Sequence, residues 1–149
     1  MVHSRITMYI LFKEFHSVSA YLVLAILLFA IIYHAYSWAI KKPFSKLHKT
    51  SALVAMMAVH TQFLVGLVLY FLSPLGLSNF SGAAMKVAIT RLFIVEHPLV
   101  MFLAIALITI GYSKANNATK INGKYKMIVV FYSIGLLCIL SRIPWSMWI

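Results

Sequence analysis

Long apolar intervals, each with at most one lysine, arginine, aspartate or glutamate, dominate the chain. A transmembrane helix needs about 20 predominantly apolar residues, and four intervals come to about this length, at residues 17–40, 50–72, 93–112 and 127–149. Alternating segments of about 10 residues, which are typical of membrane barrel strands, do not occur. The pattern therefore predicts an all-α, four-transmembrane-helix bundle in which residues 1–149 form a single integral membrane domain.

The stretch between the second and third intervals has a different pattern. Pro74 and Gly76 interrupt the chain where the second apolar interval ends. Residues 82–92 then mix Lys86 and Arg91 with apolar side chains, which is typical of an amphipathic helix in the membrane interface. We therefore predict an interfacial segment that leads into the third span.

Composition indicates that lipid is the solvent for most of this chain. Hydrophobic residues make up 63% of the sequence and charged residues 10%, whereas soluble domains have about 45–50% and about 25%. The single cysteine, Cys138, excludes an internal disulfide and a multi-cysteine metal or iron–sulfur site within the chain. Phosphate-binding glycine loops and zinc-protease motifs are missing from the sequence, so we assign no catalytic residue.

The net charge of +11 is distributed unevenly over the predicted loops. Eight lysines lie in the first and third loops: Lys41, Lys42, Lys46, Lys49, Lys114, Lys120, Lys124 and Lys126. The opposite side carries four basic residues: Arg5, Lys13, Lys86 and Arg91. Because basic residues accumulate in cytoplasmic loops, we predict a multi-pass protein of the bacterial inner membrane with both termini in the periplasm. This topology explains the charge without a nucleic acid partner.

Ionisable residues within membrane spans are costly and often mark functional sites. The spans contain six ionisable or strongly polar residues of interest: His34, His60, Gln62, Glu96, His97 and Arg142. His16 stands at the outer mouth of the first span. These residues are the candidates for a site within the bilayer.

The depth of each candidate can be estimated by counting from the inner lysines at about 1.5 Å per residue. The count places His97 ~25 Å, Arg142 ~24 Å and His60 ~16 Å from the nearest inner lysine. Glu96 therefore shares a level with His97 and Arg142 in the outer third of the membrane. We predict that Glu96 pairs with Arg142 or orients a histidine, and that Pro98 kinks the third span near His97.

Paired histidines on facing helices are suited to axial ligation of haem iron, because neutral imidazole is a standard ligand. His97 is the first candidate ligand, followed by His60 and then His16. His60 and His97 differ by ~9 Å in estimated height, so both the His60–His97 and the His16–His97 pairs stay open. A histidine that is not a ligand could instead form a hydrogen bond to a quinone. Arg142 could neutralise a haem propionate, and Gln62 is a candidate supporting residue.

The remaining histidines are assigned other roles. His34 lies only ~10 Å from Lys41 along the first span and is predicted to be structural. His48 lies in the first lysine-rich loop, so we expect it to be solvated or interfacial.

Several motifs along the chain resemble those of a known family. They are Phe15-His16-Ser17, Lys42-Pro43-Phe44, His60-Thr61-Gln62, Val95-Glu96-His97-Pro98 and Ile143-Pro144-Trp145. Together they are similar to a family of small four-helix bacterial membrane proteins described as cytochrome b-like, and the resemblance covers nearly the whole chain. It implies a haem-associated bundle and carries over His16, His60 and His97 as the histidines that stand in its motifs.

Three functions follow as hypotheses. The first is a small b-type cytochrome or haem-binding subunit that relays electrons near the outer half of the membrane, with quinol as a candidate donor. The second is a non-redox accessory or assembly subunit of a larger membrane complex, whose polar residues hold its helices together. The third is a metal or proton carrier that uses the same histidines. The expected partners are the lipid bilayer and either other membrane or respiratory subunits or further copies of this chain.

Overall fold

A computed structural model describes residues 2–148, with side chains described for residues 6–147. The side chain of Arg5, which the charge prediction counted, lies outside this range. Described residues form helices and connecting turns only. The long helices are α1 (Val2–Ala39), α2 (Lys46–Leu72), α5 (His97–Asn117) and α6 (Ile121–Ser141). The shorter ones are η1 (Leu77–Asn79), α3 (Gly82–Lys86), α4 (Ala88–Arg91), the π-helical turn η2 (Leu92–Glu96) and α7 (Trp145–Trp148).

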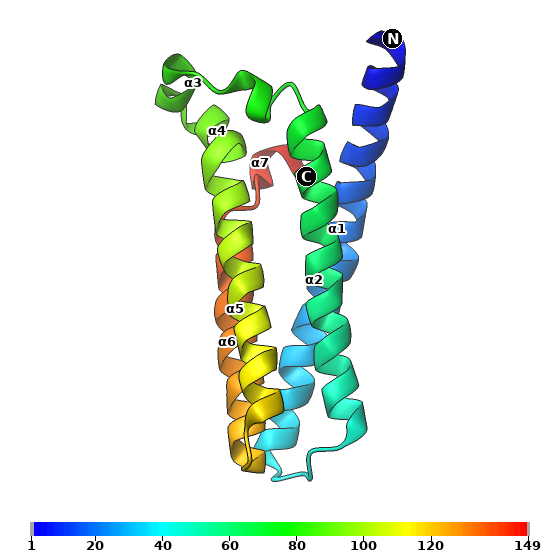
Figure 1. Ribbon diagram of the computed structural model, residues 1–149, viewed down its shortest axis with the longest axis vertical. Coiled ribbons are helices and arrows are strands. Elements are labelled where there is room, and N and C mark those ends of the chain that lie inside the picture. Colours follow the sequence, from blue (N-terminus) through cyan, green and yellow to red (C-terminus); the bar gives the residue numbers. More distant parts are fainter. Residues whose placement is uncertain (1, 149) are drawn as a thin grey trace.

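Four described segments are long and apolar enough to cross a membrane, with α4, η2 and α5 joined into one of them. The chain is thus a multi-pass membrane protein, and the predicted all-α, four-helix fold is confirmed. The long helices alternate in direction along the bundle (Figure 1). Helix α1 packs along α2 and α5 along α6, while α1–α6 and α2–α5 contacts join the two pairs.

The two ends of the bundle differ in content. One end, here called the lysine-rich end, carries the loops α1–α2 and α5–α6. The other, here called the terminal end, carries the start of α1, the segment from η1 to α4, and α7 (Figure 1). This arrangement places the amphipathic segment and the end of α6 together at the terminal end.

Small residues allow the closest helix approach in the bundle. A Cβ added at Gly111 of α5 would lie 2.5 Å from the Cβ of Phe131, and one added at Gly135 of α6 would lie 2.7 Å from Cγ1 of Ile108. Van der Waals packing through small residues is the usual source of helix association in lipid. Many large apolar side chains point outward instead, as expected when lipid covers the molecule.

The fourth long helix ends earlier than the sequence predicted. Helix α6 ends at Ser141, Arg142 is its C-cap residue, and the chain turns before α7 begins at Trp145. Pro144 explains the turn, because proline lacks a backbone N–H and disfavours helical geometry at the residue before it. Arg142 was predicted within a span, and this is wrong: it follows the end of the helix.

His48 was predicted to be solvated or interfacial, and the structure contradicts the solvated alternative. Its side chain is fully buried, and its Nδ1 accepts a hydrogen bond of 3.1 Å from the backbone N–H of Ser45 at the start of α2. Its Nε2 lies 3.1 Å from Oγ of Ser37, and the Tyr33 ring stacks on it at 4.7 Å. His48 is therefore a buried helix-capping residue, which its place in a lysine-rich loop did not reveal.

His34 occupies a structural position, as predicted. It is fully buried, and its two ring nitrogens face the carbonyl oxygens of Ala30, at 2.7 Å, and His48, at 3.0 Å. The contact with His48 connects α1 with α2 at the lysine-rich end.

Candidate histidine site

The candidate site begins at a break in regular α-helical geometry. Residues Leu92–Glu96 form a π-helical turn directly before His97, and Pro98 lies in the first turn of α5. Proline cannot donate to the carbonyl four residues earlier, which is that of Ile94. The hydroxyl of Tyr70 on α2 donates to this carbonyl oxygen at 3.0 Å. A π-helical turn is thus present where a kink was predicted, and α2 supplies a hydrogen bond where the proline removes one.

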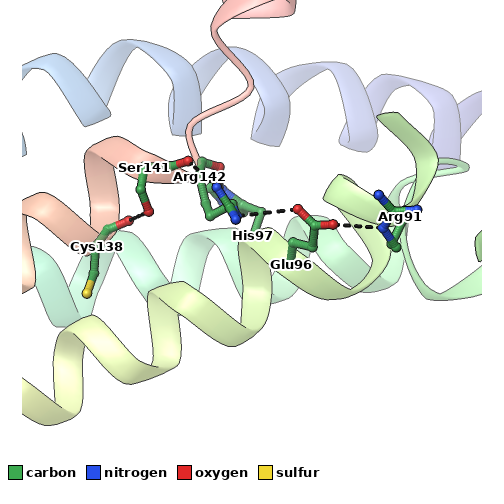
Figure 2. A network of polar contacts seen from close by, with 6 residues as sticks. All are labelled: Arg91, Glu96, His97, Cys138, Ser141 and Arg142. Carbon is green, nitrogen blue, oxygen red and sulfur yellow. Dashed lines mark hydrogen bonds and ion pairs between the residues drawn. The ribbon is translucent and has the colours of Figure 1, made fainter. Parts of the chain in front are cut away.

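Three charged groups form an ion-pair network beside this turn. Nε of Arg91 lies 2.8 Å from Oε1 of Glu96, and Nε of Arg142 lies 3.3 Å from Oε2 of the same carboxylate (Figure 2). The predicted pair between Glu96 and Arg142 is confirmed. Arg91 was not predicted as a partner, because it lies five residues before Glu96 and the π-helical turn that brings the two together was not predicted.

This network has an excess of positive charge. One carboxylate faces two guanidinium groups, and the Glu96 side chain is 30% exposed against 43% for Arg91 and 45% for Arg142. Exposed pairs in water contribute only about 0–1 kcal/mol each. A hollow of about 400 Å³ lies beside the three residues, lined also by Ser141 and Ile143. The network can thus accept a further anionic group at the terminal end.

His97 is held by the chain that follows α6. Its Nδ1 lies 2.8 Å from the backbone carbonyl oxygen of Arg142. Because a carbonyl only accepts hydrogen bonds, the ring proton lies on Nδ1 and Nε2 presents its lone pair. This arrangement, an imidazole oriented by a backbone carbonyl, is the usual support for a metal-binding histidine.

His16 on α1 is held by α2. The Gln62 amide nitrogen lies 2.7 Å from the backbone carbonyl oxygen of His16 and 3.2 Å from Nδ1 of the His16 ring. Oε1 of Gln62 in turn accepts from the hydroxyl of Ser19 at 2.7 Å. The ring fits against Gly66, where an added Cβ would come within 2.8 Å of its Cε1. In this network Nδ1 of His16 accepts, so the ring proton lies on Nε2.

The structure brings His16 and His97 together. Their ring centroids are 6.4 Å apart, and the ring planes are inclined at 82°. Two imidazoles on opposite faces of one metal ion, each about 2 Å from it, have ring centres about 6 Å apart. The separation of the His16 and His97 rings is therefore compatible with both imidazoles holding a single metal ion.

The structure does not bring His60 to this pair. Nδ1 of His60 lies 2.8 Å from the carbonyl oxygen of Met56, and Nε2 lies 3.2 Å from Oγ1 of Thr109. Thr109 follows His97 by twelve residues in α5, or about 18 Å along the helix. The estimate of ~9 Å was smaller because counting residues assumed untilted helices that start level. His60 thus connects α2 with α5 well below His16 and His97.

Comparison of the chain with known protein families, with curated proteins and with solved structures gives no match. Within the described residues, no group of three or more His, Cys, Asp or Glu side chains is placed to hold a metal ion. The candidate site accordingly consists of two histidines, their supporting groups and the adjacent ion-pair network.

Proposed function

We propose that the protein is a small b-type cytochrome, or haem-binding subunit, of the bacterial inner membrane. The observation that carries this proposal is the approach of His16 and His97 to 6.4 Å across α1 and α5. With both termini in the periplasm, as the lysine distribution favours, the site lies in the outer half of the membrane. Quinol is the candidate electron donor, and a respiratory membrane subunit is the candidate partner.

The donor set fits a haem held by two imidazoles. His97 would bind through Nε2, because its Nδ1 is already held by the carbonyl oxygen of Arg142. His16 would be the second ligand. The excess positive charge of Arg91 and Arg142 suits the propionate groups of a haem. When bound, haem supplies reversible one-electron transfer.

The residues around the pair orient it for this role. Glu96 holds the side chain of Arg142, whose carbonyl oxygen fixes the ring of His97. Gln62 holds His16 at both its ring and its carbonyl oxygen. Ligation by His16 through Nε2 requires the ring proton on Nδ1, so the Gln62 amide, which now donates to Nδ1, would have to move away from that atom. In the present tautomer, Nε2 of His16 is a donor suited to a quinone carbonyl.

Absorption spectroscopy of the purified chain tests the proposal. The chain, expressed with haem supplementation, is expected to show a stoichiometric b-type spectrum on dithionite reduction, with porphyrin quantified as its pyridine haemochrome. His97→Ala and His16→Ala should each abolish or strongly alter this spectrum. His60→Ala is the matched control and should retain it, because His60 contacts Thr109, which lies about 18 Å along α5 from His97. A colourless wild-type chain, or loss only in His60→Ala, would overturn the proposal.

A non-redox accessory subunit is the second candidate, favoured by the polar contacts between helices. The hydroxyl of Tyr132 donates to the carbonyl oxygen of Ala52 at 2.8 Å, and His60 contacts Thr109. Such contacts stabilise a bundle without any cofactor. Under this function the chain stays colourless and co-purifies with other membrane subunits. A chain that binds a metal ion without a porphyrin spectrum would instead support a carrier.

A further inference from the structure

A hollow of about 320 Å³ opens at the lysine-rich end, opposite the histidine site. Three separate parts of the chain surround it: the start of α2, the last turns of α5 and the first turn of α6. Three lysines line it, Lys46 and Lys49 from α2 and Lys124 from α6. The hollow therefore gathers cationic side chains that are distant in sequence.

Nothing anionic within the described chain balances these lysines. The sequence has only two acidic residues, Glu14 and Glu96. Glu96 is paired at the terminal end, and Glu14 precedes the end of α1 at Ala39 by 25 residues, or about 37 Å. The first turn of α2 also contains no acidic residue, although a helix N-terminus itself carries partial positive charge. The site is electrostatically incomplete without an anion.

The lining also provides hydrogen-bonding groups and a fixed cation. Nζ of Lys124 lies 5.7 Å from the centre of the Phe44 ring and 3.4 Å from the carbonyl oxygen of Ala115. Asn116 and Tyr112 add an amide and a phenol to the wall. Contact with an aromatic ring restrains an ammonium group, so its contact with Phe44 limits the movement of this lysine. Such a mixture of lysines and neutral donors suits an oxyanion with several acceptor oxygens.

We propose that this lysine hollow binds a phosphate group, carried either by the headgroup of an anionic phospholipid or by a free phosphate compound. Basic pockets between transmembrane helices at the headgroup level are a known way of binding phospholipids. The positive-inside preference explains the number of lysines in these loops. It does not explain why lysines of α2 and α6 converge on one hollow.

Lipid binding to the purified full-length chain tests the site. Native mass spectrometry in detergent would measure the apparent Kd for phosphatidylglycerol and for phosphatidylcholine. In the hollow variant, Lys46→Gln, Lys49→Gln and Lys124→Gln are combined. Its affinity for phosphatidylglycerol is expected to fall by about a hundredfold, or about fivefold per lysine.

A second triple variant provides the matched control. The loop variant combines Lys114→Gln, Lys120→Gln and Lys126→Gln, which removes the same charge from the same end without touching the lining of the hollow. Its affinity is expected to stay within about threefold of wild type. Circular dichroism and size-exclusion chromatography check that both variants keep their fold.

The outcomes separate the two sources of phosphate. Preference for phosphatidylglycerol that inorganic phosphate does not displace assigns the site to a lipid headgroup. Competition by inorganic phosphate, with a matching shift in thermal stability, assigns it to a free phosphate compound. Equal losses in the hollow and loop variants would show diffuse attraction and overturn the proposal, as would equal affinity for both lipids without any effect of phosphate. The haem spectrum does not enter this test, so the two proposals stand or fall separately.

Discussion

At the scale of single residues, the partner of Nδ1 decides what each histidine can do. In His97 this atom donates to a carbonyl oxygen and leaves the lone pair of Nε2 for a ligand. In His16 this atom accepts a hydrogen bond from Gln62. The position of the His16 ring depends on the absence of a Cβ at Gly66. In His60 both nitrogens already have partners on α2 and α5. The three histidines therefore differ at Nε2, which has an available lone pair in His97, a proton in His16 and a neighbouring threonine in His60.

Gly66→Ala is expected to displace the ring of His16. The new methyl group would lie 2.8 Å from Cε1, so the ring must shift, at a cost of about 1–3 kcal/mol for overpacking. Histidine-selective NMR would detect the shift, and thermal unfolding in detergent would report the lower stability. Gly82→Ala is the control, because a Cβ there meets no atom within 4 Å. An unmoved His16 resonance with unchanged stability would contradict this account.

At the scale of elements, the segment from residue 82 to residue 98 determines the level and direction of the site. It combines two short helices, a π-helical turn and Pro98. π-helical turns are rare and often occur at functional sites. The turn brings Nε of Arg91 within 2.8 Å of Oε1 of Glu96. In a regular α-helix, side chains interact at a spacing of three or four residues, whereas these two residues are five apart. Local geometry, rather than hydrophobic pattern, creates the ion-pair network.

Tyr70→Phe is expected to loosen this segment. It removes the hydrogen bond of 3.0 Å to the carbonyl oxygen of Ile94, with an expected loss of about 1 kcal/mol in the free energy of unfolding. Hydrogen exchange of the amides around residues 92–99 should become faster. Tyr36→Phe is the control, because the Tyr36 side chain is exposed. Equal effects of the two substitutions would show that the hydrogen bond to Ile94 contributes nothing.

At the scale of the whole molecule, the two helix pairs contribute different features. The α5–α6 pair approaches closely through Gly111 and Gly135, while α1 and α2 supply the second histidine and its support. The ion-pair network and the histidine site occupy the terminal end, and the lysine hollow occupies the other. Cationic groups therefore concentrate at both ends of an apolar bundle, where charged headgroups meet the protein.

Gly111→Ala is expected to weaken the α5–α6 pair. Its Cβ would lie 2.5 Å from the Cβ of Phe131 and 3.2 Å from the carbonyl oxygen of Met127, and atoms so near the backbone move only with the helix. The free energy of unfolding should fall by about 1–3 kcal/mol. Gly123→Ala, whose Cβ would make an ordinary contact of 3.4 Å, should be neutral or stabilising by up to about 1 kcal/mol. Unfolding by denaturing detergent measures both, and a stable Gly111→Ala would refute the close-packing explanation.

The hydrophobic pattern alone determined the four spans, and residue counting placed Glu96 at the level of Arg142. Both depend on properties that are nearly local: the length of an apolar run and the rise per residue of a helix. Which histidine lies beside His97 was decided by tertiary structure, because helix tilt, rotation and the π-helical turn change heights by amounts comparable with the ~9 Å at issue. The burial of His48 and the convergence of Lys46 and Lys124 likewise depend on contacts between segments far apart in sequence. No periodicity within one segment records such contacts.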